Sequence, residues 1–227
     1  MMYSKMLKRL LRICPFIFCL FSLIVFADPV YFKQFTFDDD NDLLKWKKMI
    51  LNKEVDYLLR WYGAQGFVQA SSNGACSALY RRVKYRLTDY PLISWKWKVK
   101  QFPDIGEKGT EAEKDDFAAR FYVIFSSWSF SSSKFLEYVW AKDLEVGTVL
   151  GSKSGENVKR IVIRNSSSES ETWLAEVRNV YEDYKFAFGQ EPPKKVGAVA
   201  IMCDADGTNS IAESLFDDIQ IERLAEK

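Results

Sequence analysis

The sequence predicts an all-β protein, an antiparallel β-sandwich of jelly-roll type with one or two short helices. Roughly nine short segments have the composition or alternation of strands, and turn residues separate them at short intervals. Aromatic residues, which favour strands, make up 15% of the chain. The sequence contains neither an internal repeat nor an obvious linker, so we expect residues 28–227 to form one domain.

The expected strands are assigned from alternation and from short apolar runs. Leu92–Val99 alternates, with Trp95 and Trp97 on one face and lysines on the other, which is typical of a half-buried strand. Val196–Met202 is almost wholly apolar and is expected at the centre of a sheet. The other expected strands are Phe67–Ala70, Ala75–Arg81, Phe117–Phe125, Lys134–Trp140, Val158–Arg164, Thr172–Asn179 and Leu215–Leu224.

Two short helices are expected. Asn41 can cap a helix that runs to about Leu51, because apolar residues recur near one face there. Tyr181–Phe188 is the second, and Gly189 would end it. Glycine, proline and charged residues predict loops at two further places, which are 102–116 and 143–155.

The first 27 residues have the pattern of a secretory signal peptide. Basic residues between Lys5 and Arg12 precede the apolar run Ile13–Phe26, and Val25 and Ala27 place small residues before a cleavage site. The run is too short to span a bilayer comfortably, although an uncleaved anchor is the alternative. We therefore expect a periplasmic or secreted protein with no membrane span after cleavage.

Composition excludes several classes of function. Four of the 32 basic residues and none of the 31 acidic residues precede residue 28, so the remaining chain has a net charge of −3. A nucleic-acid-binding protein would instead have a basic excess. The chain has no histidine, which excludes histidine-based catalytic triads and histidine zinc sites. A bound metal would need oxygen ligands, as calcium and magnesium do.

Two cysteines, Cys76 and Cys203, lie outside the predicted signal peptide. In an exported protein they could form a disulfide that closes a long loop. The alternative is a pair of buried thiols. A catalytic cysteine is not expected, because no histidine is present to activate it.

Aromatic and charged residues on the expected strands form a candidate ligand site. Tyr138 and Trp140 share a strand face and would make a platform for sugar rings if they faced solvent; otherwise they fill the core. Asp116 and Arg120 are expected on one face at a strand start, as a buried pair or as a polar ligand site. The candidate ligand-binding residues are Asp116, Arg120, Tyr138, Trp140, Asn157 and Arg160.

A structural calcium ion is a further candidate. The turn Asp204–Asn209 gathers carboxylate and amide oxygens, although Asp-Gly also occurs in ordinary turns. Asp217 has the parity of the apolar residues around it, so its carboxylate is expected to point towards the core and to need a partner. An acidic residue of Asp38–Asp40 could meet it if the terminal strands pair. The candidate ligands are Asp204, Asp206 and Asp217.

Several stretches together resemble the bacterial exported family catalogued as domain of unknown function 3047. They lie between about Phe67 and Ile221 and comprise Ser94–Val99, Asp115–Arg120, Tyr138–Ala141, Asn157 with Arg160–Arg164, Phe188–Pro193 and Val199–Asp206. The resemblance implies an exported β-sandwich but no established activity. More loosely, Phe216–Ile221 is similar to the last strand of jelly-roll carbohydrate-binding modules, where an Asp often helps to hold calcium.

The leading hypothesis is a non-catalytic module that binds a polysaccharide or cell-wall glycan. The first alternative is a glycoside hydrolase or polysaccharide lyase with Asp116 and Glu137 as its two carboxylates. Such a pair should lie in a cleft with about 5–10 Å between the carboxylates. The second alternative is a structural protein of the cell envelope, which would have no surface lined by aromatic side chains.

Overall fold

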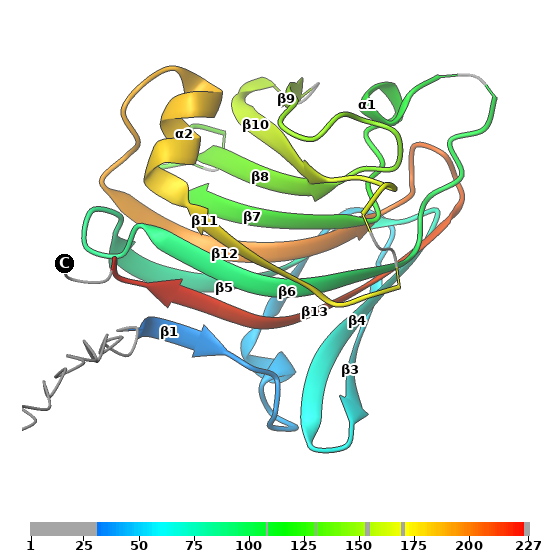
Figure 1. The fold of residues 1–227 in the computed structure, drawn as a ribbon, viewed down its shortest axis with the longest axis horizontal. Coiled ribbons are helices and arrows are strands. Elements are labelled where there is room, and N and C mark those ends of the chain that lie inside the picture. Colours follow the sequence, from blue (N-terminus) through cyan, green and yellow to red (C-terminus); the bar gives the residue numbers. More distant parts are fainter. Residues whose placement is uncertain (1–30, 108, 130, 153–154, 169–170, 225–227) are drawn as a thin grey trace, which may run out of the picture.

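The computed structural model describes residues 31–107, 109–129, 131–152, 155–168 and 171–224. The predicted signal peptide lies outside them and stays a prediction. Two β-sheets pack face to face, and Figure 1 shows β6 and β13 in front of β5 and β12. None of the helices in the described ranges is long and apolar enough to cross a membrane. The all-β sandwich predicted from the sequence is confirmed.

The strands are arranged in two sheets, which we call the first and second sheet. The first sheet has the order β11 (Leu174–Asn179), β6 (Leu92–Gln101), β13 (Ile211–Glu222), β4 (Gln65–Asn73) and β3 (Asp56–Tyr62), and β1 (Tyr31–Phe35) also pairs with β13. The second sheet has the order β2 (Lys47–Asn52), β5 (Cys76–Arg86), β12 (Lys195–Asp204), β7 (Ala119–Phe125), β8 (Lys134–Trp140), β10 (Gly155–Arg164) and β9 (Val149–Ser152). Within the described residues, only β8 and β10 pair in parallel.

The core lies between the two sheets and is rich in aromatic rings. Trp95 and Trp97 on β6 are buried, as the alternation predicts. Trp95 stacks on Phe121 of the opposite sheet at 4.3 Å between ring centroids, and Trp97 contacts Trp140 at 5.6 Å. Stacked and tilted rings add to the free energy gained from their buried area. These ring contacts therefore hold the first sheet against the second.

The helix predicted from Asn41 to Leu51 is wrong. A single 3-10 turn, Leu43–Lys45, follows Asp42, and the chain then enters strand β2. β2 pairs with β5 at the edge of the second sheet, so backbone hydrogen bonds across the sheet replace those of a helix. Strands β1, β3 and β9 were also not predicted, and the expected loop 102–116 contains the short helix α1 (Glu111–Lys114).

The second predicted helix is confirmed. Helix α2 (Val180–Phe188) connects β11 of the first sheet to β12 of the second. The Asn179 side chain accepts hydrogen bonds from the backbone amides of Tyr181 and Glu182 and caps the helix. Gly189 ends it in the left-handed conformation, with φ of 67°.

Cys76 and Cys203 are free thiols, and both are buried. They lie on paired strands, but Cys76 stands opposite Asp204 while Cys203 stands opposite Ser77. Since side chains at consecutive positions point to opposite faces of a sheet, the two sulfur atoms lie on different faces. This register excludes the disulfide and leaves the alternative of two buried thiols.

Candidate functional site

The outward face of the second sheet carries a row of side chains in register across five strands. The row runs from β5 through β12, β7 and β8 to β10 and consists of Tyr80, Ala200, Tyr122, Glu137 and Arg160. Adjacent residues on these strands fill the core, so the row faces away from it. Arg120 lies two residues before Tyr122, on the same face.

Two guanidinium groups hold one buried carboxylate on this face. Glu137 is fully buried; one of its oxygens accepts a hydrogen bond from Arg120 at 2.9 Å, and the other accepts one from Arg160 at 2.7 Å. Both guanidinium groups also lie over the ring of Phe117, at 4.8 and 5.9 Å from its centroid. Because both carboxylate oxygens are occupied, the cost of burying the charge is partly offset.

Two more carboxylates complete this group, which we call the arginine network. Asp115 accepts from Arg120 at 3.2 Å and from Arg160 at 2.9 Å. Asp204 accepts from Arg120 at 2.8 Å. Burial raises the pKa of Asp204 to about 7, although the charge of Arg120 opposes this rise. The network therefore groups two cations with three acidic side chains.

Asp116 is fully buried and binds the backbone. Its two oxygens accept hydrogen bonds from the amides of Gly207 at 3.0 Å and Thr208 at 2.6 Å. A Cβ atom on Gly207 would lie 2.3 Å from the carbonyl oxygen of Lys114, so only glycine fits this close approach. Asp116 thus holds the turn after β12 against the segment that leads into β7.

The expected pairing of Asp116 with Arg120 is wrong. β7 begins only at Ala119, and Asp115 has a positive φ of 64°. The alternation of a strand therefore does not extend back to Asp116, and Asp115 instead turns its carboxylate towards Arg120.

The predicted hydrolase pair of Asp116 and Glu137 is also wrong. Asp116 is used by two backbone amides, and Glu137 is held between Arg120 and Arg160. Both carboxylates are fully buried, so neither can reach a substrate. A hydrolytic acid or nucleophile must contact the bond that it cleaves, which this arrangement prevents.

The other predicted ligand residues do not join the arginine network. Tyr138 and Trp140 are fully buried in the core, where Tyr138 donates to Asp183 at 2.8 Å and Trp140 donates to the carbonyl of Asn165 at 3.1 Å. Asn157 lies near the start of β10 and donates to the carbonyl oxygen of Ser131 at 2.7 Å. Of the six predicted ligand residues, the structure brings only Arg120 and Arg160 onto a common carboxylate.

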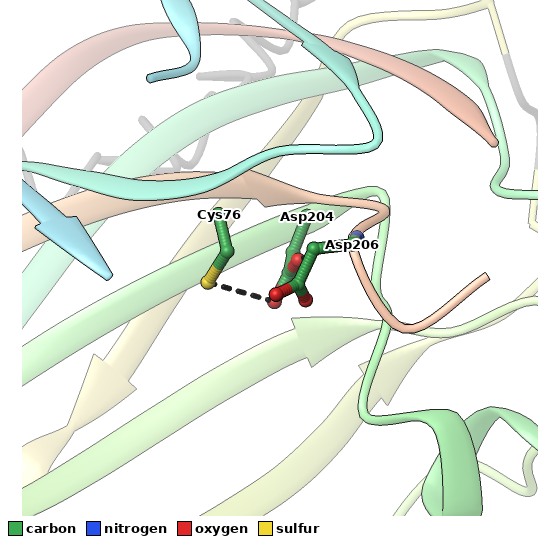
Figure 2. Close-up of side chains that lie close together, drawn as sticks. All are labelled: Cys76, Asp204 and Asp206. Carbon is green, nitrogen blue, oxygen red and sulfur yellow. Dashed lines mark hydrogen bonds between the residues drawn. The ribbon is translucent and has the colours of Figure 1, made fainter. Parts of the chain in front are cut away.

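Two of the three predicted calcium ligands lie together. Figure 2 shows the side chains of Asp204 and Asp206 beside Cys76, whose thiol lies 3.5 Å from an Asp204 oxygen. The same oxygen accepts from Arg120, and Asn52 donates to Asp206 at 2.9 Å. A thiol and a guanidinium are poor surroundings for a hard cation such as calcium. Burial and the charge of Asp204 raise the pKa of the Cys76 thiol.

Asp217, the third predicted ligand, lies on β13 in the other sheet. The expectation that its carboxylate points towards the core is wrong, because the adjacent Phe216 fills the core and Asp217 stands opposite Lys96 on the outward face. Asp217 is nevertheless buried and accepts hydrogen bonds from Gln65 at 2.9 Å and from the backbone amide of Asp218 at 2.7 Å.

Burial raises the pKa of Asp217 to about 7, and the nearby charges of Asp218 and Asp38 contribute. β1 does pair with β13, and the Asp38 carboxylate accepts a hydrogen bond from the backbone amide of Gly66, next to Gln65. Calcium binding stays a prediction, which thermal unfolding with and without a chelator tests.

Exposed aromatic side chains gather on the outward face of the first sheet. Tyr62, Gln65, Phe67, Lys98 and Trp173 line a pocket there, which we call the aromatic pocket. The rings of Phe67 and Trp173 contact each other edge to face, with 5.7 Å between centroids. Tyr62 is 83% exposed and Trp173 is 37% exposed. The pocket therefore offers ring surface to solvent, which Tyr138 and Trp140 do not.

The polar residues of the aromatic pocket can bind hydroxyl groups. The amide nitrogen of Gln65 donates to Asp217, which leaves the side-chain oxygen of Gln65 as an acceptor. Lys98 contributes an ammonium group with three donors. Strand β13 lies between β4, which carries Gln65 and Phe67, and β6, which carries Lys98, so the lining residues come from both sides of β13.

The aromatic pocket was not predicted from the sequence. One signal was present, because Phe67 alternates with Val68 and Ala70 and shares the parity of Gln65 and Gln69. A phenylalanine among glutamines on the polar face of a strand indicates an exposed ring. The contribution of Trp173 could not be found this way, since it follows a loop whose path depends on the whole fold.

We expect Glu137→Ala to lower the free energy of unfolding by about 3–5 kcal/mol, because it leaves two buried guanidinium groups without their shared carboxylate. The matched control is Glu54→Ala, which removes a surface glutamate paired with Lys48 and should change this free energy by less than about 1 kcal/mol. Urea unfolding of both variants measures the difference. Equal, small effects would show that the arginine network contributes little to stability.

We also expect the free energy of unfolding to fall as pH rises from about 5 to about 8. Asp204 and Asp217 have folded-state pKa values of about 7, above their ordinary value of 3.8, so the folded state binds these two protons more tightly. The resulting stabilisation is present in full below pH 3.8 and is lost as pH passes 7. On the order of 2 kcal/mol per carboxyl should be lost between the two pH values.

Urea unfolding at both pH values tests this for the wild type, for Asp217→Asn and for a control, Asp40→Asn, at an exposed position. Asp217→Asn removes one titrating group and should weaken the pH dependence, while Asp40→Asn should leave it unchanged. If the three proteins have the same dependence, the assignment of Asp217 is wrong.

Comparison with known proteins yields one family and several structures of similar fold. The structure described as endoglucanase cel12A from Rhodothermus marinus is 12% identical, with a TM-score of 0.48 over 79% of this chain and 93% of that chain. The CBM22-1 xylan-binding domain of Xyn10C from Paenibacillus barcinonensis is 11% identical, with a TM-score of 0.44 over 88% and 97%. The family 30 carbohydrate-binding module of a Clostridium thermocellum cellulase is 10% identical, with a TM-score of 0.43 over 80% and 93%.

No curated protein sequence matches the chain. The family model described as protein of unknown function (DUF3047) matches residues 44–220, which is most of the chain. This agrees with the resemblance found in the sequence motifs, several of which now have a structural explanation: Asp115, Asp116 and Arg120 in and beside the arginine network, and Tyr138 and Trp140 in the core. The chain belongs to the DUF3047 family.

Proposed function

We propose that this protein is a non-catalytic glycan-binding domain that acts outside the cytoplasm, and that the aromatic pocket is its binding site. The observation that supports this most strongly is the pocket itself, in which three aromatic side chains lie beside an amide and an ammonium group. A sugar ring has an apolar face and a polar rim. Aromatic rings bind such a face, and a few placed polar groups fix its orientation.

The arrangement of the polar residues favours binding over catalysis. The side chains that line the pocket include no carboxylate, so a pair of acids for glycoside hydrolysis is missing from this described surface. The carboxylates of the arginine network are used within the fold. A binding role needs only the surface that the pocket offers.

Export is part of the proposal and rests on the sequence. A basic segment, an apolar run and small residues before a cleavage site stand in the first 27 residues. Polysaccharides are the expected partners of a protein in the periplasm or outside the cell. A structural role in the envelope is the alternative, and the aromatic pocket is the feature that it does not explain.

The proposal is tested by binding of the purified protein to an array of plant, bacterial and cell-wall polysaccharides. We expect a selective hit whose affinity falls at least about tenfold in Trp173→Ala, since a stacking ring contributes on the order of 1 kcal/mol or more. The matched control is Trp128→Ala. Trp128 is 92% exposed and lies on the loop that connects β7 and β8, two strands of the second sheet.

Each outcome is decisive for the proposed site. Loss of affinity in Trp173→Ala alone supports the aromatic pocket. Equal losses in Trp173→Ala and Trp128→Ala would contradict it, and so would unchanged affinity in both. Absence of any bound glycan would remove the proposed function and favour a structural role. Thermal unfolding of both variants checks that each still folds.

A further inference from the structure

Three lysines follow one another at alternate positions on the outward face of β6, and two of them have acidic partners. The ammonium group of Lys96 lies 2.6 Å from the carboxylate of Asp218, and that of Lys100 lies 3.4 Å from Glu171. Lys98 stands between them and lines the aromatic pocket. Among the residues that the structure describes, no carboxylate lies within ion-pair distance of Lys98.

A second cation lies beside the aromatic pocket. Arg60 on β3 stands opposite Phe67 on β4, and both side chains face outward. Its guanidinium donates to the side-chain oxygen of Gln69 at 2.8 Å, and it too has no acidic partner among the described side chains. Directly opposite residues of paired strands have Cβ atoms about 5 Å apart, so Arg60 extends from a position next to Phe67, at the border of the pocket.

The nearest buried acid does not neutralise these two cations. Asp217 lies beneath the pocket on β13, where it is almost fully buried and hydrogen-bonded to Gln65 and to the amide of Asp218. Both of its carboxylate oxygens therefore accept hydrogen bonds from groups of the same sheet. Lys98 and Arg60 therefore leave the two sides of the pocket with positive charge that no described carboxylate balances.

We propose that the aromatic pocket selects glycans that carry a negative charge, with Lys98 as the residue that contacts the anionic group. This inference rests on the proposed function, since it names the class of glycan bound at the same site. A neutral sugar offers only neutral acceptors to the donors of Gln65 and Lys98. An ammonium with no described acidic partner is complementary to a carboxylate or sulfate on the sugar, and a hydrogen bond between charged groups is stronger than one to a neutral group.

Two pairs of polymers separate the effect of the negative charge on binding from the effect of the sugar backbone. Polygalacturonate is compared with its methyl ester, which has the same backbone without the free carboxylates. Dextran sulfate is compared with dextran, which tests sulfate as the anionic group. We expect the wild type to bind at least one charged polymer about tenfold more tightly than its neutral partner, and the difference should shrink as salt is added.

Lys98→Gln is the variant that tests the residue, and Lys96→Gln is its matched control. Lys96 lies two positions away on the same strand face, but its charge is balanced by Asp218. We expect Lys98→Gln to lower affinity for the charged polymer about tenfold and to lower affinity for the neutral polymer much less, because glutamine can still donate a neutral hydrogen bond to a hydroxyl group. Lys96→Gln should retain most of the affinity for both polymers.

The outcomes distinguish this inference from the proposed function. Equal binding of charged and neutral polymers would overturn the selectivity and leave glycan binding in place. Equal losses in Lys98→Gln and Lys96→Gln would overturn the role of Lys98, because they indicate a general effect of positive charge. If the protein binds none of the four polymers and no glycan of the array, the proposed function itself is overturned.

Discussion

Burial of two guanidinium groups is the constraint on which the second sheet depends. Arg120 and Arg160 can lie on a closed face only because Glu137 accepts a hydrogen bond from each, while Asp115 and Asp204 accept most of the rest. The network joins β7, β8, β10 and β12 to the segment before β7. Since its side chains bind one another, they are not available to a ligand, and a binding site must be formed by other side chains.

Some aromatic residues pack in the core and others line the aromatic pocket, and the sheet face on which each one lies decides between these two roles. Trp95, Trp97 and Trp140 lie between the sheets, where their rings join one sheet to the other. Phe67 and Trp173 lie on the outward face of the first sheet and contact each other there. High aromatic content alone therefore indicates neither a core nor a platform. The face on which each ring lies decides which surface it serves.

Alternation along a strand is what the sequence could predict, and pairing between distant segments is what it could not. The faces of β6 and the position of α2 follow from local patterns, because parity and capping act within a few residues. The helix expected after Asn41 does not form, because Lys47–Asn52 pairs as a strand with the edge of β5. Arg120 was predicted to bind a ligand beside Asp116, but it is buried. Its carboxylate partners are Asp115, Glu137 and Asp204, since a positive φ at Asp115 precedes the strand.

The central claim is that the open aromatic pocket on the first sheet, and not the closed outward face of the second, is where a ligand binds. A crystal structure of the protein with an oligosaccharide taken from a polymer that it binds tests this most directly. The account predicts a sugar ring against Trp173 and Phe67, with an anionic group near Lys98. A sugar bound instead over Tyr80 and Tyr122, on the outward face of the second sheet, would contradict it.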